Sequence, residues 1–262
     1  MKRLDKLFKE KNSQVLNLYC TAGYPQLNST LEVMKALQAN GADIIELGIP
    51  YSDPLADGPV IQQSGQIALA NGMTIKKLFE QLKNFRKEIH LPVILMGYLN
   101  PVLQYGFEKF CADASATGID GLILPDMPEH EFAKEYGSII KKYKLDFIFL
   151  VTPETSEERV KKLDTLSSGF LYAVSSSSTT GSDKNMEEVS NYLQRLKSYK
   201  LKNPILAGFG IKDKSSFDAV CSHVYGGIIG SAYIKALEGS TDIESATQRF
   251  LTPIISKNYN SQ

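Results

Sequence analysis

Eight short apolar segments alternate with longer amphipathic segments, and this pattern predicts an α/β fold whose parallel sheet closes into a single (β/α)8 TIM barrel. The predicted strands are 15–20, 43–47, 93–96, 121–124, 146–151, 170–174, 204–207 and 227–230. Their starts lie roughly 25 to 35 residues apart, with one longer interval, which is room for one strand and one helix each. A doubly wound open sheet is the alternative fold.

The composition is that of a folded globular protein, because 43% of the 262 residues are hydrophobic and 22% are charged. Barrels of this kind reach about 250 residues as one domain, so residues 1–262 are predicted to form one domain. The 29 basic and 29 acidic residues cancel, which removes a general electrostatic attraction for nucleic acid or an anionic membrane. No apolar run approaches the roughly 20 residues of a membrane helix.

Cys20, Cys111 and Cys221 are far apart and form no C-x-x-C pair. Three such cysteines indicate a reducing compartment and argue against a disulfide or zinc framework. We therefore expect a cytoplasmic protein.

The helices are predicted from apolar residues at helical spacing. Leu4, Leu7 and Phe8 predict an extra N-terminal helix that covers the hydrophobic core and has no catalytic role. Charged amphipathic segments between the strands predict helices at 29–40, 75–89, 131–143, 156–166, 186–199 and 214–223.

The interval between the second and third strands is longer because residues 49–72 precede the predicted helix. This segment is predicted to be an inserted loop after strand two. Loops that follow the carboxyl ends of barrel strands build the active site, so the insertion is a candidate part of it.

Glu46 lies inside the second predicted strand. Side chains alternate along a strand, so Glu46 shares a face with Ile44, while Ile45 and Leu47 occupy the other face. A carboxyl group buried there either pairs with a base and is structural, or keeps a raised pKa and exchanges protons. The position alone leaves both interpretations open.

The inserted segment offers two further acids, Asp53 and Asp57, among prolines and a glycine that restrict the backbone. Such a loop can direct Asp57 into the same pocket as Glu46 and supply a second, charge-stabilising carboxylate. Alternatively, both aspartates only initiate turns, which is the common role of Asp beside Pro or Gly.

Glycines gather after the last two predicted strands, at Gly208, Gly210, Gly226, Gly227 and Gly230. In barrels the loops after strands seven and eight bind phosphate through backbone N–H groups, so their joint placement predicts a phosphate site, although each glycine alone could simply form a turn. No lysine ends a predicted strand, and the histidines are scattered. We expect neither Schiff-base chemistry nor a catalytic metal.

The sequence IELGIPYSDPLADGP at 45–59 resembles the signature of the tryptophan synthase alpha subunit family. The similarity continues through TAGYP at 21–25, MGYLNP at 96–101, YAVS at 172–175, GFGI at 208–211 and GSA at 230–232. It therefore covers nearly the whole chain.

The resemblance implies a lyase that reversibly cleaves indole-3-glycerol phosphate into indole and glyceraldehyde 3-phosphate, in the last steps of L-tryptophan biosynthesis. It implies that Glu46 gives and takes the protons and that Asp57 stabilises positive charge on the indole nitrogen. The implied substrate-binding residues are Tyr19, Met96, Tyr172, Thr180, Gly181, Phe209, Gly210, Gly230 and Ser231. No cofactor is implied in this subunit.

The resemblance also implies a partner, the pyridoxal-phosphate beta subunit, in an alpha2beta2 heterotetramer. One departure concerns the serine-rich segment 175–181, which we interpret either as a turn or as a lid over the ligand. Ser178 and Thr179 stand where the family has glycine and valine, so the departure affects closure of this segment more than the chemistry.

Two other functions would be compatible with part of this sequence. A phosphosugar isomerase or epimerase on the same fold would share the glycines, but it would not need the Asp57 loop. A non-catalytic subunit that only activates a beta partner would not need both Glu46 and Asp57.

Overall fold

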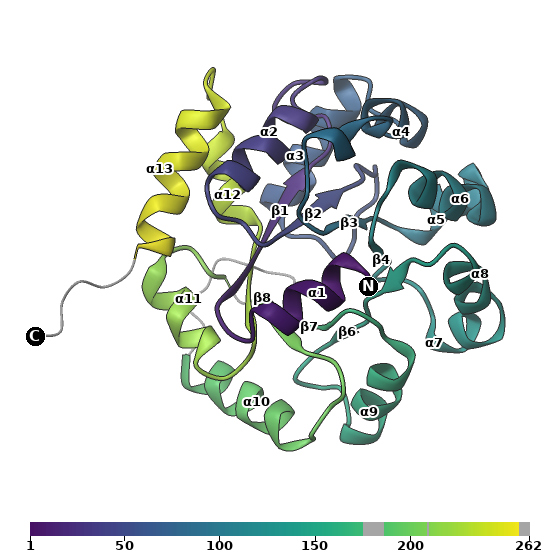
Figure 1. The fold of residues 1–262 in the computed structure, drawn as a ribbon, viewed down its shortest axis with the longest axis vertical. Helices are drawn as coiled ribbons and strands as arrows, with labels where there is room; N and C mark the ends of the chain where they lie inside the picture. The colour runs from purple at the N-terminus through teal and green to yellow at the C-terminus, as the bar shows by residue number, and fades with distance from the viewer. Residues whose placement is uncertain (175–185, 209, 257–262) are drawn as a thin grey trace, which may run out of the picture.

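The structure is a computed structural model that describes residues 1–174, 186–208 and 210–256. Its strands all run parallel and form a single sheet. They are β1 (Val15–Thr21), β2 (Ile44–Gly48), β3 (Val93–Met96), β4 (Gly121–Ile123), β5 (Asp146–Phe147), β6 (Leu150–Val151), β7 (Leu171–Val174), β8 (Ile205–Gly208) and β9 (Gly226–Ile229). The helices form a ring around these strands (Figure 1).

The sheet has the strand order β5-β4-β3-β2-β1-β9-β8-β7-β6, and its two outer strands belong to one chain segment. Within that segment, the Ile148 N–H donates to the carbonyl oxygen of Leu122 at 3.0 Å, while the Phe149 carbonyl oxygen accepts from the Tyr172 N–H at 3.1 Å. Residues 146–151 therefore bond to β4 on one side and to β7 on the other, and they close the barrel. The predicted barrel is confirmed, with its fifth strand divided in two, and the open doubly wound sheet is wrong.

The helices and helical turns were predicted less completely than the strands. They are α1 (Arg3–Glu10), α2 (Thr30–Ala39), α3 (Pro59–Ala70), α4 (Ile75–Leu82), η1 (Phe85–Lys87), α5 (Leu99–Tyr105), α6 (Phe107–Thr117), α7 (Glu129–Glu131), η2 (Phe132–Tyr136), α8 (Gly137–Lys142), α9 (Glu157–Leu166), α10 (Met186–Ser198), α11 (Lys214–Cys221), α12 (Ser231–Leu237) and α13 (Ile243–Ile255). Side chains of Thr74, Ser156, Asp213 and Asp242 cap the starts of α4, α9, α11 and α13, each contributing about 1 kcal/mol.

The prediction that residues 49–72 form an inserted loop is wrong for its second half. Residues Pro59–Ala70 form α3, so the loop that follows β2 is confined to residues 49–58. Pro59 stands at the first helical position, where its missing N–H costs nothing and its fixed φ suits the helix. The proline thus begins a helix rather than extending the loop.

The N-terminal helix α1 covers the amino-terminal ends of the strands and lies across the middle of the ring (Figure 1). Leu4 is fully buried in a cluster inside the barrel, and Leu7 and Phe8 pack against that cluster. The other buried members are Val15, Ile44, Ile94, Ile123, Ile148, Phe170, Leu206 and Ile228. Lys2 donates to Asp146 at 2.7 Å and Arg3 to Asp120 at 2.9 Å, which fixes the helix in place. The predicted core-covering helix is confirmed.

The alternation predicted for the second strand is also confirmed. Ile44 belongs to the cluster inside the barrel, whereas Ile45 and Leu47 pack in the larger cluster between the sheet and the helices. Glu46 therefore faces the interior, where it is 1% exposed. A period of two places this carboxyl group on the face of Ile44, and closure of the sheet makes that face the interior of the barrel.

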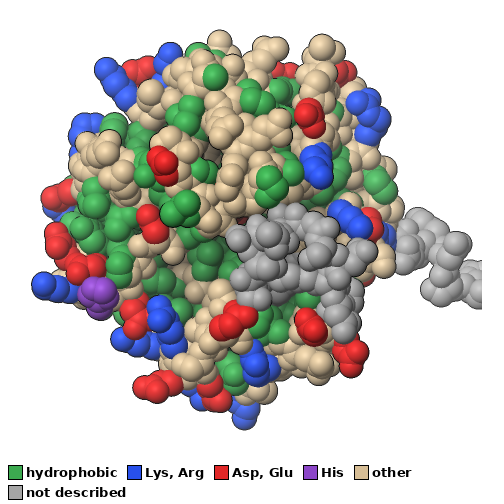
Figure 2. Space-filling view, turned by 180° about the vertical axis from the view of Figure 1, so that it is seen from behind, with side chains coloured by type: hydrophobic (Ala, Val, Ile, Leu, Met, Phe, Trp, Pro, Cys, Tyr) green, Lys and Arg blue, Asp and Glu red, His purple; other side chains and the backbone are tan. Residues whose placement is uncertain are grey.

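The three cysteines are free thiols, as the sequence predicts. Within the described ranges no helix combines the length and the apolar character that crossing a bilayer requires. The face turned away from α1 mixes acidic and basic side chains around its rim (Figure 2), in agreement with the net charge of zero.

Candidate active site

Glu46 is a buried carboxyl group inside the barrel. Its Oε2 accepts a hydrogen bond from Asn17 Nδ2, on the neighbouring strand β1, at 2.9 Å. Burial raises the pKa of Glu46 to about 8, the Asn17 hydrogen bond opposes this rise, and the negative charge of Asp57 adds to it. Among the described residues Glu46 takes part in no ion pair. The structure thus favours the proton-exchanging interpretation over the structural one.

Asp57 lies near the end of the loop that follows β2 and is partly exposed. Its N–H donates to the carbonyl oxygen of Pro54 at 3.0 Å, and its own carbonyl oxygen accepts from Gln62 Nε2 at 2.9 Å. Burial raises the pKa of the Asp57 carboxyl to about 6, while a hydrogen bond from the Tyr98 hydroxyl opposes the rise. That hydroxyl also accepts from the Ala56 N–H at 3.1 Å, so Tyr98 holds the loop at two points.

The two carboxyl groups are in different protonation states near pH 7. With a pKa of about 8, Glu46 is mainly protonated, whereas Asp57, with a pKa of about 6, is mainly ionised. Glu46 can therefore donate a proton while Asp57 stabilises positive charge, because the pKa values of the two groups differ. Asp53, by contrast, is exposed and accepts a hydrogen bond from its neighbour Ser52, as expected of a turn residue.

Two tyrosines line the same interior, and each lies over a glycine of the next strand. A Cβ built on Gly48 would approach the Tyr19 hydroxyl oxygen to 2.1 Å, and one built on Gly208 would approach the Tyr172 hydroxyl oxygen to 2.8 Å. Burial raises the pKa of both tyrosines well above the ordinary value, and the Glu46 and Asp57 charges add to the rise, so the hydroxyls stay neutral.

Three of the remaining predicted residues border this interior or the ends of its strands. Met96 ends β3 and packs against the interior cluster. Gly230 precedes α12, and a Cβ on it would lie 3.6 Å from Tyr19 Cβ, which brings it close to the tyrosine. Ser231 is the first residue of α12.

Gly210 follows β8 in an exposed position with φ of +60°, a conformation that favours glycine. Outside the described residues lie Phe209 and the serine-rich segment 175–181, which includes Thr180 and Gly181. The phosphate site and the lid therefore stay predictions.

Two partners of the carboxyl groups were missed at the level of sequence, Asn17 and Tyr98. Asn17 interrupts an otherwise apolar strand at the interior-facing positions, as Glu46 does, and this was a usable signal. Tyr98 had no comparable signal, because its contact with Asp57 depends on how the loops after β2 and β3 meet.

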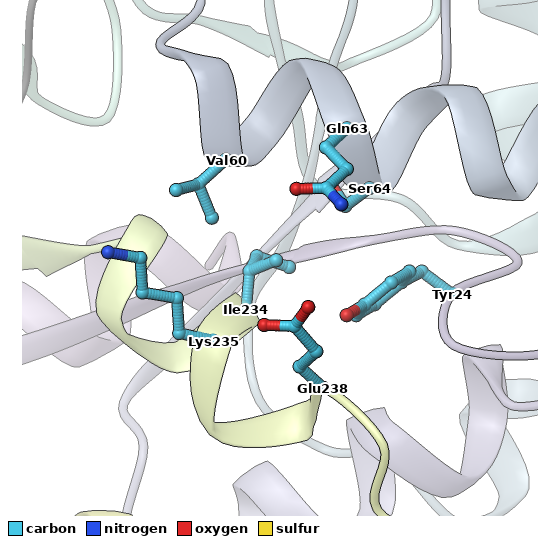
Figure 3. Close-up of a pocket in the computed structure, with 7 residues that line it drawn as sticks. All are labelled: Tyr24, Val60, Gln63, Ser64, Ile234, Lys235 and Glu238. Carbon is cyan, nitrogen blue, oxygen red and sulfur yellow. The ribbon is translucent and has the colours of Figure 1, made fainter.

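A small pocket of about 50 Å³ lies on the outer side of the barrel wall, between α3 and α12 (Figure 3). It is lined by Tyr24, Val60, Gln63, Ser64, Ile234, Lys235 and Glu238. Ser64 Oγ lies 2.6 Å from Thr21 Oγ1, which in turn donates to the Tyr19 hydroxyl at 3.4 Å. The pocket is thus separate from the site of Glu46 but is joined to it by a short polar chain.

A closed parallel barrel with a protonated acid inside and an ionised carboxylate on the loop of the same strand defines a (β/α)8-barrel protein equipped for acid–base chemistry. The family model of the tryptophan synthase alpha chain matches residues 6–258, and the chain belongs to this family, which comprises lyases of tryptophan biosynthesis. Membership decides against the isomerase or epimerase alternative.

Individual members of the family are similar to this chain over nearly its full length. A tryptophan synthase alpha chain of Parabacteroides distasonis is 46% identical over 252 residues, covering 96% of this chain and 98% of the relative. One of Flavobacterium johnsoniae is 49% identical over 232 residues, covering 88% and 92%. The crystal structure of tryptophan synthase subunit alpha from Legionella pneumophila superposes with a TM-score of 0.88 at 36% identity, covering 97% of each chain.

Proposed function

We propose that residues 1–262 act as one catalytic barrel domain that reversibly cleaves indole-3-glycerol phosphate into indole and glyceraldehyde 3-phosphate. The observation that carries the proposal is the burial of Glu46 inside the barrel, at 1% exposure, with Asp57 on the loop of the same strand, close enough for its charge to add to the raised pKa of Glu46. Membership of the tryptophan synthase alpha chain family supports it. The reaction is proposed to need no cofactor in this chain, because it consists of proton transfers and the cleavage of one carbon–carbon bond, with no change in overall oxidation state.

In the proposed reaction Glu46 donates its proton to C3 of the indole ring, which places positive charge on the ring nitrogen. The resulting carboxylate then accepts the proton of the adjacent glycerol hydroxyl. The oxygen forms a carbonyl, the carbon–carbon bond breaks, and its electron pair returns to the ring. The products are neutral indole and an aldehyde, and Glu46 is protonated again.

Asp57 is proposed to stabilise the intermediate charge. An ionised carboxylate beside the ring nitrogen interacts more strongly with the cationic intermediate than with the neutral substrate, which is the condition for lowering the barrier. The hydrogen bond from Tyr98 and the contacts of the loop backbone hold this carboxylate in position before substrate binds.

The substrate is proposed to bind between the tyrosines and the glycine-rich strand ends. Tyr19, Met96, Tyr172 and Phe209 would contact the indole ring, an arrangement usual for a flat apolar ligand. Gly181, Gly210, Gly230 and Ser231 would bind the phosphate through backbone N–H groups. Thr180 would meet Asp57 when segment 175–181 closes.

The chain is further proposed to assemble with a beta subunit that holds pyridoxal phosphate, in an alpha2beta2 heterotetramer located in the cytoplasm. A solved structure of tryptophan synthase from M. tuberculosis in its aminoacrylate-bound form resembles this chain with a TM-score of 0.84 at 30% identity. Leu55, in the loop that carries Asp57, is 89% exposed, and a partner that covers it would bury apolar surface.

The direct test is to measure indole released from indole-3-glycerol phosphate by the purified chain, with and without a beta subunit, beside Glu46→Gln as the matched inactive control. We expect release by the wild type alone and faster release with the partner. Absence of release in both conditions would contradict the catalytic proposal and leave the activating-subunit alternative.

A further inference from the structure

Asn17 is a fully buried amide in the interior of the barrel, at 0% exposure. It lies on β1 opposite Ile44 of β2 and Ile228 of β9, both members of the interior apolar cluster. An amide in such surroundings destabilises the fold unless its polar atoms are hydrogen-bonded. Its presence at this position therefore calls for a reason beyond packing.

The two polar atoms of this amide are used unequally. Nδ2 donates to Glu46 Oε2 at 2.9 Å, whereas Oδ1 has no hydrogen-bond partner among the described residues. The Asn17 N–H can therefore stabilise the carboxylate form of Glu46, and the unpartnered Oδ1 of the same amide is available as an acceptor.

An amide can partner a carboxyl group in both of its protonation states. Its NH2 donates to the carboxylate, and after a half-turn about the Cβ–Cγ bond its oxygen accepts the O–H of the carboxylic acid. A lysine would leave the O–H of the acid without an acceptor, and an apolar side chain would serve neither form. A carboxyl group that cycles between the two forms inside an apolar barrel has a partner for the carboxylate and for the acid O–H only beside a side chain that both donates and accepts.

We propose that Asn17 is a positioning residue that holds the Glu46 carboxyl group through both halves of its proton cycle and sets how readily it takes and releases the proton. The inference rests on the proposed function, in which Glu46 is the group that cycles. Asn17 itself is not proposed to touch the substrate.

The other groups that face Glu46 do not perform this role. Asp57 carries a negative charge, which disfavours the carboxylate of Glu46. Tyr19 on β1 and Tyr172 on β7 keep neutral hydroxyls, but among the described residues neither makes a hydrogen bond with Glu46, whose side-chain partner is Asn17. Burial raises the pKa of the Cys20 thiol to about 12. On β3 the residue in register with Glu46 is the apolar Ile94. Asn17 is the group among these whose hydrogen bond favours the charged form.

The first test follows the titration of Glu46 in the free protein by NMR of carboxyl-labelled glutamate, with the signal assigned by its loss in Glu46→Gln. We expect Asn17→Leu to raise the midpoint by roughly one pH unit, a tenfold change in proton affinity, because the carboxylate loses its donor. Asn17→Gln, which keeps the amide, should lie closer to the wild-type midpoint. Ile228→Val, in the same interior layer, should match the wild type.

The second test uses the wild-type side chain and so does not depend on the folding of a variant. The amide signals of Asn17 in nitrogen-labelled protein should titrate with the same midpoint as Glu46 and lose that dependence in Glu46→Gln. An unchanged midpoint in folded Asn17→Leu, or Asn17 amide signals that ignore pH across the Glu46 titration, would overturn the inference.

The activity of Asn17→Leu separates this inference from the proposed function. If both hold, turnover at saturating indole-3-glycerol phosphate falls several-fold, KM stays the same, and the pH profile moves with the Glu46 titration. A shifted titration with unchanged turnover would support the role of Asn17 and contradict the catalytic role of Glu46.

Discussion

The hydroxyl of Tyr19 occupies the space in which a side chain on Gly48 would begin, since a Cβ there would lie 2.1 Å from the hydroxyl oxygen. Tyr19 pairs in register with Glu46, two residues before that glycine. Tyr172 has the same relation to Gly208, because it pairs with Leu206 two residues earlier. Both rings therefore lean over a glycine of the following strand, and the missing side chains leave the room that the two rings occupy.

Gly48→Ala is expected to displace Tyr19 and to lower the free energy of unfolding by about 1–3 kcal/mol, the usual range for overpacking an interior. Urea unfolding measures the effect. The control is Gly65→Ala in α3, where a Cβ would come no nearer than 3.9 Å to another residue, so its stability should equal or exceed that of the wild type. Equal losses in the two variants would contradict this account of Tyr19.

Glu46→Gln is expected to leave the fold intact and to lower turnover by about 10²- to 10⁴-fold, because the amide matches the carboxyl group in shape but cannot exchange a proton. Indole release at saturating substrate measures the effect, with circular dichroism as the control for folding. A variant that kept more than about a tenth of the wild-type rate would remove Glu46 from the mechanism.

The raised pKa of Glu46 also predicts how stability depends on pH. The folded protein keeps this proton up to about pH 8, whereas the unfolded chain loses it near the ordinary value of 4.5. The Glu46 contribution is therefore fully present below about pH 4.5 and is lost as pH rises toward 8, with a slope of at most about 1.4 kcal/mol per pH unit.

Unfolding free energies between pH 6.5 and 8.5 test this sign. Glu46→Gln should gain stability relative to the wild type as pH rises, because glutamine has no proton to lose. Asp57→Asn should still lose stability as pH rises, but over a slightly lower pH range than the wild type, because the negative charge that adds to the raised pKa of Glu46 is gone. Parallel curves for the wild type and Glu46→Gln would refute the raised pKa.

Asp57→Asn is expected to bind indole-3-glycerol phosphate almost as well as the wild type but to turn it over slowly. The amide can still hydrogen-bond the ring N–H, but it cannot balance a positive charge on the intermediate. Steady-state kinetics separate the two effects. Weakened binding with an unchanged saturated rate would mean that Asp57 only positions the ligand.

The parts of the site that sequence predicts are those governed by local periodicity. Alternation along β2 is enough to put Glu46 on the same face as Ile44, and this grouping is confirmed. Closure of the sheet then makes that face the interior of the barrel. The hydrogen bonds to the two carboxyl groups come from Asn17 and Tyr98, on other segments. Those contacts depend on strand register and loop packing, which no local pattern determines.

The start of α3 and the fifth strand also show where local sequence patterns fail to predict the structure. The Gly58-Pro59 pair reads locally as a turn, yet it starts α3, because proline at the first helical position is compatible with both structures. The fifth strand was predicted as one piece from its apolar run, and it is divided because its two halves pair with different neighbours. Tertiary pairing thus decided the division of the fifth strand.

The ion pairs that hold α1 in place determine when this helix can dock during synthesis. The helix is held by Asp120 and Asp146, which lie 117 and 144 residues further along the chain from their partners Arg3 and Lys2. The ribosome adds α1 long before it adds those aspartates, and Phe170 of the same cluster comes later still. During synthesis α1 therefore cannot dock until the segments that carry these three residues have been made.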